Sequence, residues 1–198
     1  VTGVVSLTPY QWDVISQTAN SIDTGDTGSG STGIIEWSAD GVNVYITTHD
    51  GDDTFRQYVC STPYDFSTAT LLRAVRPVQD LGFFTTNLTY ALSSDGVYLF
   101  GLQLSTNGPT QRCTLTTPFD IGGGTSDHSA VYTFSNSGFC HSLQISDDGR
   151  KIFQYDDAPA LVEYTLATPY DLSSASLTGT TSFTDPLVST QGKMVFAK

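Results

Sequence analysis

The chain has 198 residues, enough to bury roughly 70% of its unfolded surface, and carries 20 acidic against eight basic residues for a formal net charge of −12. This charge repels nucleic acid phosphates and anionic headgroups, so we expect no nucleic acid partner, and no run of 18 apolar residues is present to span a membrane. Glycine, serine and threonine are abundant and aromatic residues make up 12% of the chain, which is typical of a β-rich protein with many turns.

The first 33 residues predict two short strands and a flexible connection. A strand-like run over residues 1–7 leads to the turn Thr8-Pro9-Tyr10, and Val14-Ile15 follows as a second strand. The stretch Gly28-Ser29-Gly30-Ser31-Thr32-Gly33 matches a dinucleotide-binding pattern, but it precedes a strand where a dinucleotide site requires it to follow one. We therefore interpret it as a loop without a cofactor.

Residues 31–76 predict a unit of four strands joined by two kinds of turn. A strand ending at Trp37 meets an Asp-Gly turn, which is the strongest short-range hairpin signal because both central residues of a type I′ turn need positive φ. Strands at Val44-Tyr45-Ile46 and residues 55–59 follow, and a Pro-aromatic turn then leads to a last strand over residues 69–75. Alternating apolar positions place Ile35 and Trp37 on one face of the first strand.

The same order of strands and turns recurs over residues 84–135 and 138–180. Successive prolines of the Pro-aromatic turn are 54, 55 and 51 residues apart. The Pro-aromatic turn occurs as Thr8-Pro9-Tyr10, Thr62-Pro63-Tyr64-Asp65, Thr117-Pro118-Phe119-Asp120 and Thr168-Pro169-Tyr170-Asp171. The Asp-Gly turn occurs as Ser38-Ala39-Asp40-Gly41, Ser93-Ser94-Asp95-Gly96 and Ser146-Asp147-Asp148-Gly149, and in a degenerate form as Ser189-Thr190-Gln191-Gly192. Four short antiparallel strands per unit of about 50 residues are typical of a propeller blade.

Comparison of the repeated units predicts two further details. The strand after each Asp-Gly turn carries an aliphatic and then an aromatic residue, at Val44-Tyr45, Val97-Tyr98, Ile152-Phe153 and Val195-Phe196. In the second unit, Gly122-Gly123-Gly124 is interpreted as a loop insertion before a last strand over residues 130–134.

The two ends of the chain are complementary halves of one further unit, because residues 1–20 supply its last two strands and residues 181–198 its first two. We therefore predict an all-β fold in one domain, residues 1–198: a four-bladed β-propeller of four-stranded antiparallel blades, one blade split between the N- and C-termini. The residues that would close or exchange the split blade are Val1, Val4, Val5, Met194, Val195 and Phe196. They would pair within one chain or between neighbouring chains.

At its Ser-x-Asp-Gly turns, and at Gln57-Tyr58, Thr62-Pro63-Tyr64-Asp65 and Ser67-Thr68-Ala69-Thr70, the chain resembles β-propeller repeats of phage tail and virion-associated proteins and of secreted proteins of aquatic bacteria. The resemblance covers nearly the whole chain and implies a propeller with no common enzymatic activity. It transfers no catalytic residue, because the recurring residues are turn and core positions. The first copy departs from the pattern at Gln11-Trp12-Asp13, and the last has Gln191 in place of the aspartate.

Three aspartates, Asp50, Asp52 and Asp53, form the strongest candidate metal site, since hard carboxylate oxygens suit Ca²⁺. Their spacing does not match an EF-hand loop, and such acids are more often a solvated surface. Further acidic loops contain Asp23, Asp26, Asp156 and Asp157. No other cofactor is expected.

The remaining reactive residues indicate structural roles. His49, His128 and His141 fall at different places in the repeat, without a metal-binding spacing, and no Gly-x-Ser-x-Gly elbow is present. Cys60, Cys113 and Cys140 are interpreted as buried thiols, although one disulfide among them stays open. Asn87 begins an Asn-Leu-Thr glycosylation sequon.

These patterns favour a non-enzymatic structural or adhesive subunit of an extracellular filament or virion appendage, assembling as a homo-oligomer through strand pairing or packing of propeller faces. The alternative is a module that binds a surface glycan or protein with aromatic residues such as Tyr10, Trp12 and Tyr64. A hydrolase or lyase on a propeller is a third hypothesis, which needs a polar cluster at the channel mouth.

Overall fold

The computed structural model describes residues 31–49, 54–83, 88–105, 107–133, 140–156 and 160–182, which form three antiparallel sheets of four strands each. Each sheet is built from consecutive strands. Blade 1 holds β1 (Ser31–Trp37), β2 (Asn43–His49), β3 (Thr54–Cys60) and β4 (Ala69–Val75). Blade 2 holds β5 (Leu88–Leu92), β6 (Tyr98–Gln103), β7 (Pro109–Thr117) and β8 (Asp120–Thr133). Blade 3 holds β9 (Cys140–Ile145), β10 (Lys151–Asp156), β11 (Ala160–Leu166) and β12 (Ala175–Ser182).

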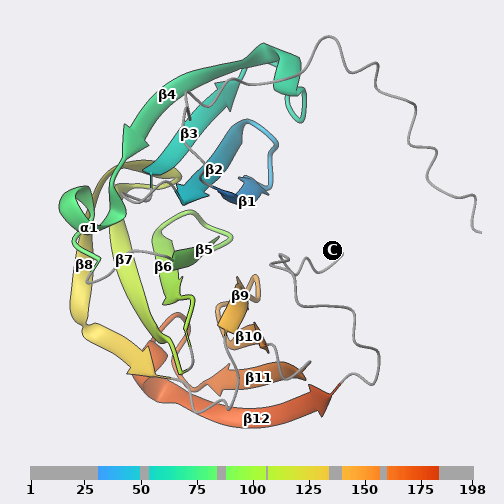
Figure 1. Ribbon diagram of the computed structural model, residues 1–198, viewed down its shortest axis with the longest axis vertical. Coiled ribbons are helices and arrows are strands. Elements are labelled where there is room, and N and C mark those ends of the chain that lie inside the picture. Colours follow the sequence, from blue (N-terminus) through green and yellow to red (C-terminus); the bar gives the residue numbers. More distant parts are fainter. Residues whose placement is uncertain are drawn as a thin grey trace, which may run out of the picture.

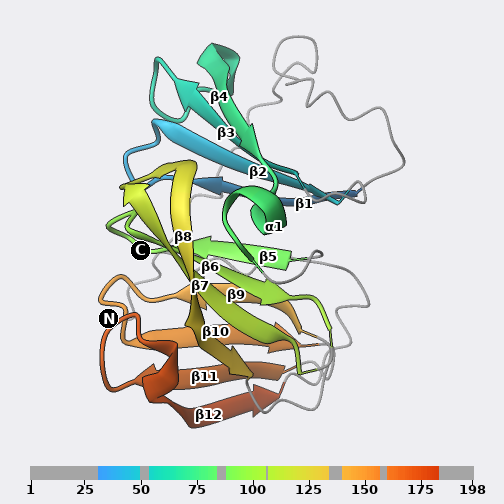
Figure 2. The ribbon, with the colours of Figure 1, turned by 90° about the vertical axis from the view of Figure 1, so that its left-hand side faces the viewer.

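The three blades are arranged around a common axis (Figure 1), with β1, β5 and β9 innermost and β4, β8 and β12 outermost. In that view blade 1 points upward, blade 2 to the left and blade 3 downward. Seen from the side, the sheets follow one another from top to bottom in chain order (Figure 2). This is the arrangement of propeller blades.

The prediction of an all-β fold built from four-stranded antiparallel blades is therefore confirmed. The blade count of four stays a prediction, because residues 1–30 and 183–198, which would make the split blade, lie outside the described residues. Helical structure within the described ranges is confined to α1 (Pro77–Asp80) and to two single turns, η1 (Phe66–Thr68) and η2 (Leu172–Ser174). No helix in the described part of the chain is long and apolar enough to cross a membrane.

Both faces of blade 2 are buried, one against blade 1 and the other against blade 3. Strand β6 contributes to both cores because successive side chains of a strand point to opposite faces of the sheet. Leu99 on β6 packs toward blade 1, in a core with Tyr45 and Phe55. Its neighbour Phe100 packs toward blade 3, in a core with Leu143 and Tyr164. The alternation of β6 thus holds three blades together through two separate cores.

The two repeated turn motifs form one structural unit in each blade. The turn glycines Gly41, Gly96 and Gly149 have φ of 71°, 70° and 67°, and the turn aromatics Tyr64, Phe119 and Tyr170 have φ of 60°, 63° and 61°. In every blade the aromatic N–H donates to the glycine carbonyl at 2.9 Å, and the aromatic ring covers the glycine. A Cβ at Gly96 would lie 2.5 Å from the Phe119 ring, so only glycine fits beneath the ring. We call this arrangement the aromatic–glycine contact.

The structure corrects the repeat alignment in the second unit. Trp37, Leu92 and Ile145 at the ends of the inner strands pair with Val44, Leu99 and Ile152. The residues equivalent to Val44-Tyr45 are therefore Leu99-Phe100, and the prediction of Val97-Tyr98 was wrong by two residues. The error arose because Val97-Tyr98 is also an aliphatic–aromatic pair, and only the strand register separates the two choices.

Gly122-Gly123-Gly124 was also misassigned as a loop insertion. These residues lie inside β8, which begins at Asp120. The guanidinium of Arg73 from blade 1 occupies the space that a Gly122 side chain would need, and its Nε lies 3.0 Å from Oδ1 of Asp120. Gly122 therefore marks the close approach of a neighbouring blade, whereas an added Cβ at Gly124 would meet Cys113 of its own blade. Similarly, Ser31-Thr32-Gly33 belongs to β1 and not to a preceding loop.

Candidate binding site on the turn face

The Asp-Gly and Pro-aromatic turns lie together on one side of the three blades, which we call the turn face (Figure 2). Each Asp-Gly turn is fixed by its own side chains. In blade 1, Ser38 Oγ donates to Asp40 Oδ1 at 2.6 Å, the same carboxylate oxygen accepts the N–H of Val42, and the Ser38 hydroxyl accepts the N–H of Asn43. The hydrogen bond from Ser38 holds the pKa of Asp40 below its ordinary value.

The same serine–aspartate bond of 2.6 Å recurs between Ser93 and Asp95 and between Ser146 and Asp148. The aspartates of the other turn have a similar local role, since Asp65 and Asp171 accept the N–H of the residue two positions later and cap η1 and η2. These five carboxylates are therefore engaged in holding the turns.

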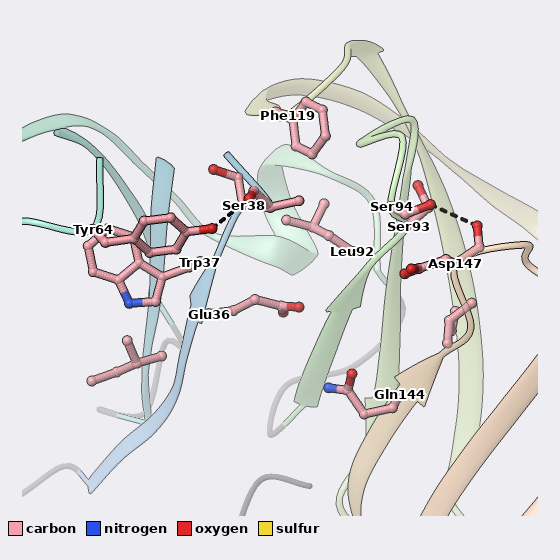
Figure 3. Close-up of a pocket in the computed structure, with 13 residues that line it drawn as sticks. Glu36, Trp37, Ser38, Tyr64, Leu92, Ser93, Ser94, Phe119, Gln144 and Asp147 are labelled. Carbon is pink, nitrogen blue, oxygen red and sulfur yellow. Dashed lines mark hydrogen bonds between the residues drawn. The ribbon is translucent and has the colours of Figure 1, made fainter. Parts of the chain in front are cut away.

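A pocket of about 400 Å³ opens on the turn face where the ends of the three inner strands meet. It is lined by residues of all three blades, as Figure 3 shows: Glu36, Trp37 and Tyr64 on one side, Leu92, Ser93 and Ser94 between, and Gln144 and Asp147 opposite. Ser94 Oγ donates to the backbone carbonyl of Asp147 at 2.8 Å and so joins blades 2 and 3 at the rim.

The blade 1 side of the pocket is aromatic. The rings of Trp37 and Tyr64 are tilted, with centroids 5.4 Å apart, and Phe66 meets the same indole edge-on at 4.9 Å. The Tyr64 hydroxyl donates to the carbonyl of Ala39, yet 60% of this residue is exposed. The described lining also includes the acidic residues Glu36 and Asp147 and neither a basic residue nor a histidine. Aromatic surface beside hydrogen-bond acceptors suits a sugar or a peptide better than an anion.

Hydrogen bonds between blades converge on the turn aromatics. The carbonyl of Phe119 in blade 2 accepts from Tyr45 Oη at 2.7 Å and from Gln57 Nε2 at 2.8 Å, both in blade 1. The carbonyl of Tyr170 in blade 3 accepts from Arg112 Nη1 of blade 2, also at 2.8 Å. Burial raises the pKa of Tyr45, so its hydroxyl stays a donor.

Several predicted site residues lie outside the described residues. These are the calcium candidates Asp50, Asp52 and Asp53, the acids Asp23, Asp26 and Asp157, the closure residues Val1, Val4, Val5, Met194, Val195 and Phe196, the aromatics Tyr10 and Trp12, and the sequon residue Asn87. Their roles stay predictions. Within the described ranges, no group of three histidine, cysteine, aspartate or glutamate side chains is placed to hold a metal.

The histidines lie on strands of different blades: His49 ends β2, His128 lies in β8 and His141 in β9, where its ring is 6.3 Å from that of Tyr155. Cys60, Cys113 and Cys140 are buried free thiols, as predicted.

Sequence reasoning recognised Tyr64 but missed the residues that surround it. Trp37 was expected only as a strand residue, and Glu36, Gln144 and Asp147 were not singled out. The repeat held a usable signal, because Glu36 and Gln144 each stand one residue before the last apolar position of an inner strand.

Comparison with known proteins supports the fold. No protein-family model matches the chain, and neither does any curated protein. A solved protein from Bacteroides uniformis, provisionally named a 6-phosphogluconolactonase, is similar over 78% of this chain and 42% of its own length, with 13% identity and a TM-score of 0.50. The Swd1 β-propeller domain of Myceliophteria thermophila is similar over 79% of this chain and 45% of its own length, with 12% identity and a TM-score of 0.47. The WD40 repeats of RRP9 are similar over 78% of this chain and 39% of their own length, with 13% identity and a TM-score of 0.47. The chain spans less than half the length of these structures.

Proposed function

We propose that this chain is a non-enzymatic structural subunit that assembles with further copies of itself through the outer strands of its blades, in an extracellular filament or a virion appendage. The setting is supported by the resemblance of its repeats to phage and secreted propeller repeats.

The observation that carries the proposal is the outer edge of blade 3. β12 pairs only with β11 among the described strands, and seven of its eight residues are exposed. The strand contains no charged residue and no proline, and Leu177 on it is 58% exposed. Soluble proteins ordinarily protect an outer strand with charges, prolines or a covering segment, because its unpaired N–H and C=O groups recruit another strand.

The outer strand of blade 1 has a related surface. Leu71 and Leu72 on β4 are 55% and 49% exposed, beside the single charge of Arg73. Two outer strands with exposed leucines offer a second copy both backbone hydrogen bonds and apolar contact. The outer strands β4 and β12 lie away from the inner strands (Figure 1), and no residue of either strand lines the pocket.

A charge placed on the edge tests the proposal. We expect the wild-type chain to form oligomers whose mass in light scattering rises with concentration, and Thr180→Lys on β12 to shift them toward monomer, because a lysine on an outer strand opposes pairing. Ser61→Lys adds the same charge at an exposed turn residue and serves as the matched control. A monomeric wild-type chain at all concentrations, or equal behaviour of the two variants, would reject assembly through β12.

The second candidate function is binding of a glycan or a protein segment at the turn-face pocket. It is favoured by the exposed Tyr64 ring beside Trp37 and by the acceptors Glu36 and Asp147. A glycan array probed with wild type and with Glu36→Gln tests it, because a bound sugar would lose an acceptor while the aromatic–glycine contact stays intact. Binding that the substitution leaves unchanged would place any ligand elsewhere.

A further inference from the structure

The face of the blade 3 sheet that points away from blade 2, which we call the outer face of blade 3, is less covered than the equivalent faces of the other blades. Tyr45 in blade 1 and Phe100 in blade 2 occupy the same repeat position on the face toward the next blade, and they are 1% and 0% exposed. Their counterpart in blade 3, Phe153, is only half-buried. On blade 1 the opposite face shows the same contrast, since Ile35 is 51% exposed and its equivalents Tyr90 and Leu143 are 2% and 0%.

Each blade carries a pair of contacting side chains on the face toward the next blade, which we call the donor pair. One member stands two residues after the turn glycine and the other six residues before the turn proline. In blade 1 these are Asn43 and Gln57, joined by a hydrogen bond of 2.8 Å. In blade 2 they are Tyr98 and Arg112, with the guanidinium 5.0 Å from the ring centroid.

The donor pair has the same target at both described interfaces between blades. Gln57 donates to the carbonyl of Phe119, and Arg112 donates to the carbonyl of Tyr170. Both acceptors are the aromatic residue of a Pro-aromatic turn with positive φ. The chemistry of the pair varies, but a nitrogen donor aimed at this carbonyl is common to both interfaces.

Blade 3 presents a third donor pair, Lys151 and Glu163, with Nζ and Oε1 2.8 Å apart. Both side chains are partly exposed, at 49% and 30%. An ammonium group has three donors, so Lys151 can hold Glu163 and still donate to a carbonyl. In blades 1 and 2 the donor is the member six residues before the turn proline, Gln57 or Arg112, whereas in blade 3 that member is the acceptor Glu163. The donor that blade 3 can offer to a Pro-aromatic turn is therefore the other member of the pair, Lys151.

We propose that the outer face of blade 3 binds the Thr8-Pro9-Tyr10 turn of the chain's own N-terminal segment, with Lys151 donating to the carbonyl of Tyr10. Of the four Pro-aromatic turns, those of Phe119 and Tyr170 are bound by a donor pair of a described blade. The other two are the Tyr64 turn, which belongs to blade 1, and the Tyr10 turn, and Tyr10 corresponds to Phe119 and Tyr170. A segment tethered to the same chain has a high effective concentration at the face, which favours it over the same turn from a second copy.

Cross-linking of the full-length chain tests the docking. Glu163→Cys and Gln11→Cys, introduced together, place one thiol at the position equivalent to Gln57 and one directly after the turn aromatic, as Asp120 directly follows Phe119. Gln57 contacts the N–H of Ile121, the next residue, at 3.1 Å. A short bismaleimide should then link the double variant within one monomer, as read by intact mass and peptide mapping. The native cysteines are buried, and each single variant controls for them.

The outcomes separate the possible occupants. A linked monomer supports the proposal, whereas dimers from a mixture of the two single variants would show that a second copy supplies the turn and would overturn it. No link between the two sites, in protein that circular dichroism shows to be folded, would also overturn it.

A donor variant then tests the role of Lys151 itself. Lys151→Met in the double-cysteine background should slow linking about five- to tenfold, as expected for loss of one charge-assisted hydrogen bond. Arg150→Met removes a neighbouring cation whose guanidinium instead donates to Ala167 within blade 3, so its linking rate should not change. Equal cross-linking rates for the two variants would show that Lys151 does not contact the docked turn. This test is independent of assembly through β12, because the cross-link is read within a monomer.

Discussion

The aromatic–glycine contact predicts that Gly96→Ala destabilises the fold far more than an alanine at an open position. Gly96 has φ of 70°, where an L-residue costs roughly 1–2 kcal/mol. The new Cβ would also lie 2.5 Å from the ring of Phe119, so the ring must move and lose packing that we put at about 1–2 kcal/mol. The expected loss in free energy of unfolding is therefore about 2–4 kcal/mol, a large share of the roughly 5–15 kcal/mol typical of a domain.

Urea unfolding followed by circular dichroism measures this loss. With a slope of about 2 kcal/mol per M, the midpoint should fall by about 1–2 M without a change of slope. Gly179→Ala is the matched control, because Gly179 lies on β12, has no positive φ and has no neighbouring atom within 4 Å of an added Cβ. Its midpoint should stay close to that of wild type.

A double variant separates the two contributions to the loss at Gly96. In a Phe119→Ala background the ring clash is absent, so Gly96→Ala should cost only the backbone strain of roughly 1–2 kcal/mol. If Gly96→Ala and Gly179→Ala unfold at the same urea concentration, or if removal of the ring leaves the cost unchanged, the aromatic–glycine contact does not hold the turns as described.

Three further predictions concern single groups. The hydrogen bond from Ser38 lowers the folded-state pKa of Asp40, so this carboxylate contributes to stability above its unfolded pKa of about 3.9, and the contribution is lost as pH falls through its folded pKa. The urea concentration at the unfolding midpoint should therefore decrease when the pH is lowered below about 4, and it should decrease less in Asp40→Asn. Burial raises the pKa of the Cys113 thiol to about 11, so a thiol reagent at neutral pH should label it only after unfolding. Tyr45→Phe removes a donor to Phe119 and should cost about 0.5–1.5 kcal/mol in the same unfolding assay, whereas no change would mean that this bond adds nothing to the interface.

Much of the fold was predictable because the turn motifs are dictated by local chemistry. An aspartate followed by glycine, or a proline followed by an aromatic residue, limits the backbone within four residues, and two such turns recurring out of phase predict four strands per blade. The predicted strand over residues 69–75 was confirmed as β4.

The contacts between distant segments were not predictable in the same way. Gly41 and Tyr64 are 23 positions apart, and the sequence of either turn gives no sign that the other covers it. The glycines of β8 were predicted to be a loop, because the side chain that accounts for Gly122, that of Arg73, belongs to another blade.

The donor pairs could not be predicted from the repeats for a different reason. Their positions recur, but the residue types change from an amide pair to a ring with a guanidinium and then to an ion pair. The pairs of blades 1 and 2 share a donor directed at a carbonyl, and this can be recognised only when the acceptor is seen. The pocket residues Glu36 and Gln144 were missed in the same way, since different inner strands bring them together.

The residue Phe119 joins two kinds of contact, because its ring covers Gly96 within blade 2 while its carbonyl accepts hydrogen bonds from blade 1. Phe119 makes both contacts while holding a positive φ of 63°, and we expect the ring contact to favour the conformation that aims the carbonyl at blade 1. Forming the turn within one blade therefore prepares the acceptor for its neighbour, and docking of the neighbour stabilises the turn. Unfolding should spread from blade to blade as a cooperative transition with nearest-neighbour coupling, and not as the independent melting of separate sheets.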